Sequence, residues 1–322
     1  MKVTFNPQMK LLWNWDRVND WLKTGDNVPV LIEISPTNYC NAKCPWCFYG
    51  GTHSGDGINK DVMLRTLSDM ASMGIKAISW TGGGEPTLHP NINEFNETAH
   101  KLGFSQGLFT NALSYEKNRI NPEFYDWIRI SLTEKFMDGI DRKLLKEYTS
   151  SKTPIGICLN VTEESYPKAY EYAKQAKELG VYYFQVRPAL AKTYDKQKNL
   201  EIPYKLKELE DENFKIILSE YKFEDATKPR TYDTCYGHNF CPVIDFRGDV
   251  NVCMYKLGKE PYIFGNLNEH SFLDIWKSDK RKKIKACKLV DNDCQVCCKD
   301  HEINKLLYHI KHPDRESNID FI

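Results

Sequence analysis

The stretch PVLIEISPTNYCNAKCPWCFYG, residues 29–50, begins as an apolar segment and ends as a loop with three cysteines. Residues 29–35 predict a buried strand, because they form a short apolar run with a turn signal behind it. Cys40, Cys44 and Cys47 follow that strand directly. In parallel α/β folds, the loops after the strands face the ligand-binding site. The stretch therefore predicts a thiol-lined site at the carboxyl end of the first strand.

Three thiols are one short of the usual zinc set. A structural zinc ion takes four ligands, and His53 is the only candidate near this loop for the fourth. A cluster of four irons takes one protein ligand per iron. Three cysteines would leave one iron open to bind another molecule, so the count favours an iron–sulfur cluster with an open position.

Outside this stretch the chain alternates between strand-like and helix-like segments as far as residue 188. The predicted strands are residues 29–35, 76–80, 105–110, 126–132, 154–162 and 181–188. The predicted helices are residues 60–74, 91–103, 139–149 and 165–180. Such alternation indicates parallel βα units, and six units are too few for the closed eightfold barrel. We predict an α/β fold, a partial (β/α)6 TIM-like barrel with a small cysteine-rich C-terminal domain.

Composition divides the chain into four parts. Residues 1–27 predict an N-terminal helical extension that ends at Gly25. Residues 28–190 predict the barrel, and residues 191–233, which are polar and charged, predict a linker or helical connection. Residues 234–322 predict the cysteine-rich domain and a terminal helix.

The chain has 322 residues, with 44 Lys plus Arg against 44 Asp plus Glu. This neutral balance argues against broad electrostatic capture of nucleic acid. We see no export signal and no apolar run near the roughly 20 residues of a membrane span, so we expect a cytoplasmic protein. In a reducing compartment, the eleven cysteines are better explained by metal binding or catalysis than by disulfides.

A second motif, TGGGEP at residues 81–86, follows the second predicted strand. No Lys-Ser/Thr follows the glycines, so the segment is not a phosphate-binding P-loop. Glu85 would repel a phosphate, whereas an acid beside exposed backbone suits a ligand with a positive amino group.

The spacing of Cys40, Cys44 and Cys47, followed by this glycine loop, resembles the radical S-adenosylmethionine superfamily. The resemblance implies a [4Fe-4S] cluster whose open iron chelates S-adenosylmethionine (SAM). It implies reductive cleavage to methionine and a 5′-deoxyadenosyl radical, which takes a hydrogen atom from substrate. An external one-electron reductant, a flavodoxin or ferredoxin, is implied as a partner.

The resemblance also assigns roles to residues of the cofactor site. Trp46 would pack near the adenine, and the loop of Gly83, Gly84, Glu85 and Pro86 would hold the methionine amino group. Asn111 lies in FTNA (109–112), where Ala112 replaces the glycine of many members. Ser131, at the end of the fourth strand, would contact the ribose or carboxylate of SAM. Arg187 ends the last strand and is a further candidate.

A second group of cysteines lies in the C-terminal part of the chain. CYGHNFCPVIDFRGDVNVC spans residues 235–253 and CQVCC residues 294–298. Residues 242–246 and 249–255 predict a hairpin that turns at Gly248, with a cysteine at each end. Such a hairpin makes a metal cradle, and a bound metal would stabilise so small a unit. A zinc site with four cysteine ligands would also fit.

This region resembles the SPASM and twitch extensions of the same superfamily. Position 303 is Ile and no cysteine follows Cys298, so the shorter twitch type with one auxiliary [4Fe-4S] cluster is implied. Cys235, Cys241 and Cys253 are the first candidates for its ligands, followed by Cys294 or Cys297. Cys298 is a spare ligand, a hydrogen-atom donor or a buried thiol. Cys158 and Cys287 are expected to be ordinary buried thiols.

We predict a radical enzyme that abstracts hydrogen from a small-molecule substrate such as a sugar, aminocyclitol or nucleoside, for oxidation, epimerisation or rearrangement. One alternative is a peptide-modifying enzyme, although residues 1–27 are too short for a separate leader-binding domain. A non-catalytic iron–sulfur protein is the second alternative, but it would have no use for Glu85. Candidates for groups that exchange a proton or hydrogen atom with substrate are Cys298, Asp245, Tyr236 and His238.

Overall fold

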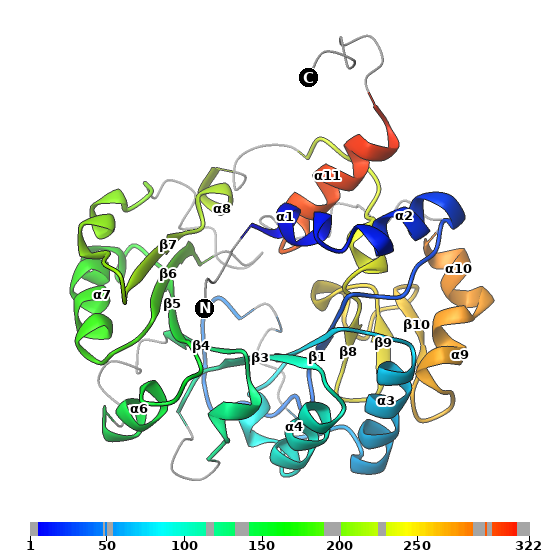
Figure 1. The fold of residues 1–322 in the computed structure, drawn as a ribbon, viewed down its shortest axis with the longest axis horizontal. Coiled ribbons are helices and arrows are strands. Elements are labelled where there is room, and N and C mark those ends of the chain that lie inside the picture. The colour runs from blue at the N-terminus through cyan, green and yellow to red at the C-terminus, as the bar shows by residue number, and fades with distance from the viewer. Residues whose placement is uncertain are drawn as a thin grey trace.

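A computed structural model describes most of the chain and shows an α/β fold built on one ten-stranded sheet (Figure 1). The described residues are 6–47, 49, 54–113, 119–132, 142–189, 201–224, 230–285, 294 and 298–313. The strand order is β10-β9-β8-β1-β2-β3-β4-β5-β6-β7. Every neighbouring pair from β8 to β7 is parallel, while β8–β9 and β9–β10 are antiparallel.

The predicted βα rhythm is present, with element ends shifted by a few residues. The first six strands are β1 (Leu31–Ile34), β2 (Ala77–Trp80), β3 (Ser105–Thr110), β4 (Trp127–Leu132), β5 (Ile155–Val161) and β6 (Tyr183–Pro188). The helices that follow strands are α3 (Lys60–Ser72), α4 (Ile92–Lys101), α6 (Arg142–Thr149) and α7 (Ala169–Glu178). Residues 139–141 of the third predicted helix lie outside the described part. The partial TIM-like barrel is thus confirmed.

The sheet continues past both ends that the sequence predicted. Residues 191–233 were expected to be a linker, yet β7 (Lys215–Leu218) lies within them and pairs in parallel with β6. The strand is only four residues long, begins with a lysine and follows a charged segment, so its pattern is weak. The same segment also contains the short helix α8 (Glu220–Glu224).

The C-terminal hairpin is part of this sheet as well. β8 (Val243–Ile244) and β9 (Asp249–Asn251) form the predicted hairpin, with Gly248 at a φ of 84°. β8 pairs in parallel with β1, where Glu33 is opposite Val243, and β10 (Ile263–Asn266) adds the outer strand. The cysteine-rich region therefore continues the barrel sheet through β1 instead of standing apart from it.

The helical extension at the N-terminus consists of α1 (Pro7–Leu12) and α2 (Trp15–Thr24), and Gly25 ends α2 in the left-handed conformation. The predicted terminal helix is α11 (His301–Lys311), which lies beside α1 (Figure 1). Gln8 Nε2 donates to Glu302 Oε2 at 2.9 Å, which joins the two ends of the chain. Among the described helices, none has the length and apolar character of a membrane span.

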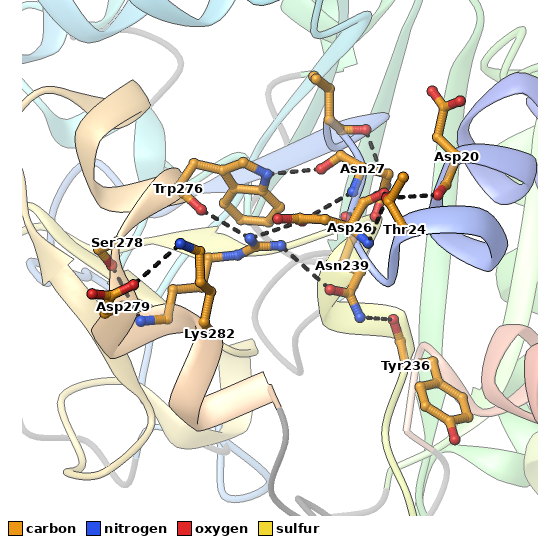
Figure 2. A network of polar contacts seen from close by, with 12 residues as sticks. Asp20, Thr24, Asp26, Asn27, Tyr236, Asn239, Trp276, Ser278, Asp279 and Lys282 are labelled. Atoms are coloured by element: carbon orange, nitrogen blue, oxygen red, sulfur yellow. Dashed lines mark hydrogen bonds and ion pairs between the residues drawn. The ribbon is translucent and has the colours of Figure 1, made fainter.

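A buried arginine joins the N-terminal extension to the C-terminal helices α9 (Phe272–Lys277) and α10 (Asp279–Lys285). Arg281 is fully buried with its guanidinium 3.5 Å from the Trp276 ring centroid. It donates to Asp26 Oδ1 at 2.9 Å and to the Trp276 carbonyl at 2.8 Å. Figure 2 shows Asp26, Asn27, Asn239 and Trp276 gathered in this network. The arginine thus holds the chain just before β1 against the helices that follow the hairpin.

We expect Arg281→Met to lower the free energy of unfolding by about 1.5–3 kcal/mol, the usual value for hydrogen bonds to charged groups. Asp26 is 36% exposed, so water can solvate it once it is alone, which limits the loss. Lys282→Met on the same helix is the matched control. It removes a surface ion pair with Asp279, which should contribute less than about 1 kcal/mol. Equal urea unfolding midpoints for the two variants would contradict the role given to Arg281.

Candidate active site

The loop after β1 carries Cys40, Cys44 and Cys47, and it lies against the glycine loop after β2. The Gly83 amide donates to Ser35 Oγ at 2.6 Å, and the Glu85 amide donates to the Tyr39 carbonyl at 2.7 Å. All three cysteines are free thiols with partial exposure. The two predicted motifs are therefore in direct main-chain contact at the carboxyl edge of the sheet.

The glycines are required by this contact. A Cβ added at Gly84 would lie 2.3 Å from the Tyr39 carbonyl oxygen, a backbone atom that cannot move aside cheaply. At Gly83 the added atom would lie 3.1 Å from the Tyr49 ring. Side chains at these positions would push the cysteine loop away from the glycine loop. The TGGG segment thus positions the cysteines as well as any ligand.

The buried carboxylate of Glu85, which is 2% exposed, joins its own turn to the end of β3. Oε1 accepts from the Thr87 amide at 3.2 Å, from the Thr87 hydroxyl at 2.7 Å and from the Thr110 hydroxyl at 2.6 Å. Oε2 accepts from the Asn111 amide at 2.7 Å. Burial raises the pKa of this carboxyl, and the hydrogen bonds oppose that rise. The sequence predicted a ligand contact here and missed this structural role.

Asn111 extends the connection back to the cysteines. Its Nδ2 donates to Asn41 Oδ1 at 2.9 Å and lies 3.7 Å from Cys40 Sγ. Ala112, beside it, has a φ of 60°, a left-handed conformation that favours glycine. That geometry explains why a glycine would suit this position, which alanine occupies here. Asn111 thus reaches the thiol loop, as its assignment to the cofactor site requires.

The other predicted cofactor residues lie at the same edge. Ser131 is the second-last residue of β4, where it pairs with Cys158 of β5, and it is partly exposed. Arg187, near the end of β6, donates from Nε to Asn160 Oδ1 at 2.6 Å. Trp46 lies within the cysteine loop and is partly buried, and Pro86 begins a short 3₁₀ turn. Their contacts with SAM remain predictions.

The three thiols fit a cluster better than a single ion. In the described part of the chain, no three His, Cys, Asp or Glu side chains converge closely enough to hold one metal ion. A four-iron cluster needs separate thiolates, one for each iron. Burial raises the pKa of the Cys40 thiol, and nearby Glu85 and Cys47 add to the rise. His53 lies outside the described residues.

Four C-terminal thiols line one small cavity. They come from the start of the cysteine-rich region, from the end of the hairpin and from the last cysteine segment: Cys235, Cys253, Cys294 and Cys298. Burial, with a smaller contribution from nearby Asp300, raises the pKa of Cys235 to about 11. Burial, with smaller contributions from Cys235 and Asp300, raises the pKa of Cys253 to about 12. Bound metal would favour the thiolates over the protonated thiols. Four thiols that line one cavity would suit a cluster with no open iron.

One predicted ligand, Cys241, lies outside this set. Cys241 is not among the side chains that line the four-thiol cavity, and its Sγ lies 3.1 Å from Lys299 Nζ. Cys297 lies outside the described residues, as does Cys287. Cys298, given three possible roles from the sequence, lines the cavity. Cys158 is fully buried on β5, as expected.

The remaining candidates for proton or hydrogen exchange have structural contacts. Asp245 is fully buried and its Oδ1 accepts from the Arg247 and Asp249 amides of the hairpin turn. Tyr236 packs edge-on to Trp21 with ring centroids 4.9 Å apart. His238 is fully buried beside Phe264. Their exchange of a proton or hydrogen atom with substrate stays a prediction.

The sequence reading missed the ion pair of Glu33 and Lys299. Glu33 is on β1, and its Oε2 lies 2.6 Å from Lys299 Nζ, in the segment that follows Cys298. The available signal was a single charge inside the apolar run LIEI. A buried charge requires a partner, but a sequence does not say which residue supplies it.

Comparison with known proteins agrees with this geometry. The Radical SAM superfamily model matches residues 34–186, and the SPASM iron–sulfur cluster-binding domain model matches residues 235–299. The fold, the thiol loop and these matches define an enzyme of the radical S-adenosylmethionine superfamily. The chain belongs to that superfamily and carries its SPASM/twitch-type region. SAM, a [4Fe-4S] radical cluster and an auxiliary [4Fe-4S] cluster are the cofactors of these domains.

Individual relatives are more distant. The tungsten-containing aldehyde ferredoxin oxidoreductase cofactor-modifying protein of Pyrococcus furiosus is 25% identical over 77% of this chain and 81% of its own. A PqqA peptide cyclase of Bradyrhizobium diazoefficiens is 26% identical over 29% of this chain and 25% of its own. Streptococcus suis SuiB bound to its precursor peptide SuiA has the same fold, with a TM-score of 0.64 and 20% identity, over 97% of this chain and 80% of its own.

We expect Glu85→Gln to lower the free energy of unfolding in the absence of SAM by about 1–3 kcal/mol. The new amide would turn a donor toward one of the donors that the carboxylate now satisfies. Glu94→Gln is the matched control, because Glu94 makes only a surface ion pair with Lys60. Anaerobic denaturation of the apo-proteins measures both. If Glu85→Gln has the same free energy of unfolding as the wild type but binds SAM weakly, the carboxylate contributes to ligand binding and not to stability.

We expect the double variant Cys235→Ala, Cys253→Ala to retain about four of the roughly eight irons of the wild type after anaerobic reconstitution. Cys241→Ala should retain all of them, because that thiol lies outside the four-thiol cavity. Iron and sulfide analysis measures both variants. Iron loss in Cys241→Ala would contradict the proposed ligand set. About four irons plus one zinc in the wild type would show that zinc, and not a cluster, occupies the auxiliary site.

Proposed function

We propose that this enzyme modifies a peptide or protein substrate by SAM-dependent radical chemistry. The observation that carries the proposal is the likeness of fold, over nearly the whole chain, to an enzyme solved with its precursor peptide. The match to a peptide cyclase supports it over a shorter stretch. Both findings favour the peptide-modifying alternative over the sugar, aminocyclitol or nucleoside substrate that we first expected.

The chain's own residues would do four things in this reaction. Cys40, Cys44 and Cys47 would hold the radical cluster, and the Gly83–Gly84 backbone would lie against SAM. When bound, the cluster and SAM supply one-electron chemistry that removes a hydrogen atom from carbon. Glu85 and Asn111 would keep the loops rigid, so that the reacting groups are held in one geometry. The C-terminal thiols would hold a cluster suited to electron transfer.

A second candidate function is modification of an organic cofactor. The cofactor-modifying protein of Pyrococcus furiosus matches along most of both chains, which favours this reading. Its sequence identity of 25% leaves the substrate open. The two functions differ in where the abstracted hydrogen atom originates, so one isotope experiment separates them.

We expect the triple variant Cys40→Ala, Cys44→Ala, Cys47→Ala to lose 5′-deoxyadenosine formation down to the level of an enzyme-free control. The auxiliary cluster should remain, because its thiols lie elsewhere. Cys158→Ala is the matched control, since that buried thiol belongs to neither group. Anaerobic incubation with SAM and a strong reductant, followed by mass spectrometry, measures the product. SAM cleavage by the triple variant would show that the radical cluster is not bound by this loop.

The substrate class is tested with uniformly deuterated peptides, incubated anaerobically with the reconstituted enzyme, SAM and a reductant. If a peptide is the substrate, deuterium should appear in 5′-deoxyadenosine and the peptide should change mass. Deuterium transfer only from a labelled organic cofactor would instead support the cofactor-modifying function.

A further inference from the structure

Exposure alternates along β4, and the alternation shows which of its side chains face the inside of the barrel. The partly exposed set is Trp127, Arg129 and Ser131, and the buried set is Ile128, Ile130 and Leu132. The buried set belongs to one hydrophobic core with residues of α4 and α6, which lie outside the sheet (Figure 1). Successive side chains of a strand point to opposite faces, so the partly exposed set points into the barrel. Arg129 therefore presents a charge to the barrel interior.

The contacts of Arg129 are with neutral groups. Its Nη1 donates to Gln185 Oε1 at 3.1 Å, and its guanidinium lies 4.0 Å from the Phe109 ring centroid. Gln185 in turn donates from Nε2 to Ser219 Oγ at 3.0 Å, which holds its amide oxygen toward the arginine. Nε of Arg129 is enclosed without a partner, whereas Nη2 is neither enclosed nor bound to a described residue. Nη2 is thus the nitrogen that a ligand can reach.

No carboxylate balances this charge. The strongest electrostatic neighbours of Arg129 are Cys158, Arg187, Tyr183 and Tyr221. Burial inside the barrel lowers the pKa of Arg129, and the like charge on Arg187 adds to the lowering. Burying an unpaired charge is costly, and proteins normally place a counter-ion beside it. An anion that enters the barrel would supply the missing counter-ion.

Arg187 adds a second positive charge to the same interior. It is partly exposed, and its Nε donates to the neutral Asn160 Oδ1 at 2.6 Å. Among the described residues, neither arginine makes an ion pair. The acid that β1 contributes, Glu33, is already bound to Lys299 at 2.6 Å. The two arginines therefore form a positive site whose charge the described part of the chain leaves uncompensated.

The position of the two arginines suits a substrate. Ser131, the predicted SAM contact, follows Arg129 on the same face of β4, about 6–7 Å further toward the carboxyl edge. Tyr255 lines the four-thiol cavity, and the charge of Arg187 opposes the rise that burial causes in the pKa of Tyr255. The arginines are thus within electrostatic reach of that cavity wall and lie deeper in the barrel than the predicted SAM contact.

We propose that Arg129, supported by the charge of Arg187, binds the carboxylate of an acidic side chain of the substrate peptide inside the barrel. The proposal rests on the proposed function and adds a specificity residue to it. A planar guanidinium matches a carboxylate through paired hydrogen bonds, which a point charge such as lysine cannot form. Phe109 and Gln185 hold the guanidinium in place, so little of its freedom remains to be lost on binding.

The proposal is tested by binding to the anaerobically reconstituted, SAM-saturated enzyme without reductant. The probes are N-acetyl-glutamate methylamide and its uncharged isostere, N-acetyl-glutamine methylamide, each titrated by ligand-observed NMR. We expect saturable binding of the glutamate probe and about tenfold weaker binding of the glutamine probe. Arg129→Gln should weaken the glutamate probe about tenfold, which corresponds to about 1.4 kcal/mol. Arg129→Lys keeps the charge but loses the paired donors, so it should weaken the probe about threefold.

Arg119→Gln is the matched control, because Arg119 makes only a surface ion pair with Glu147. It should bind the glutamate probe as the wild type does. Iron content and circular dichroism establish that each variant is folded, and Arg129→Lys decides the matter if Arg129→Gln fails to fold. Equal binding of the two probes by the wild type, or unchanged binding of the glutamate probe in the Arg129 variants, would overturn the proposal.

A further measurement separates the substrate carboxylate from that of SAM. Calorimetric titration of SAM without probe should give affinities for wild type and Arg129→Gln that agree within about twofold. If Arg129→Gln weakened SAM as strongly as the glutamate probe, the bound carboxylate would be that of SAM, and the proposal would be overturned.

The result is distinguishable from that of the isotope experiment. Probe binding that depends on Arg129, with no deuterium transfer from any peptide, would keep the carboxylate site and reject the peptide-modifying function. Deuterium transfer from a peptide, with the same dependence on peptide concentration in wild type and Arg129→Gln, would keep the function and reject the carboxylate site.

Discussion

The buried carboxylate of Glu85 is the constraint on which the rest of the site depends. It accepts hydrogen bonds from the turn that follows it and from the end of β3, while its own amide is bound by the cysteine loop. Three segments that are distant in sequence are thereby fixed at one edge of the sheet. Radical chemistry needs such rigidity, because a reactive carbon must be held next to one C–H bond and away from others.

Main-chain contact explains why glycine, and no other residue, fills the loop beside Glu85. Gly84 approaches the Tyr39 carbonyl so closely that even a methyl group would collide. The thiol spacing on its own does not place the cysteines in space. The glycine loop does that by offering a bare backbone surface against which the cysteine loop lies. The two motifs are therefore two halves of one packing arrangement.

The sequence predicted the barrel strands and the thiol loop well, because both depend on local patterns. Apolar runs such as residues 29–35, and the spacing of the cysteines, can be recognised in the sequence without knowledge of tertiary contacts. The pairing of β8 with β1 was not predictable in this way. β8 has only two residues, and so short a strand has no sequence pattern that specifies its partner or its register. Cys241 illustrates the same limit. Its place in the sequence suggests a metal ligand, and that role stays a prediction, whereas its 3.1 Å contact with Lys299 Nζ depends on tertiary structure that the sequence does not give.

The pairing of β1 with β8 also bears on how the chain is made. One edge of β1 is covered by β2, but the other waits for Val243 and Ile244, more than 200 residues further along. At a synthesis rate of about 5–20 residues per second, that edge stays unpaired for roughly 10–40 s. An unpaired apolar strand is a site for association with other chains. β1, the strand that leads into the radical-cluster loop, thus gains its second neighbouring strand only after most of the chain has been synthesised.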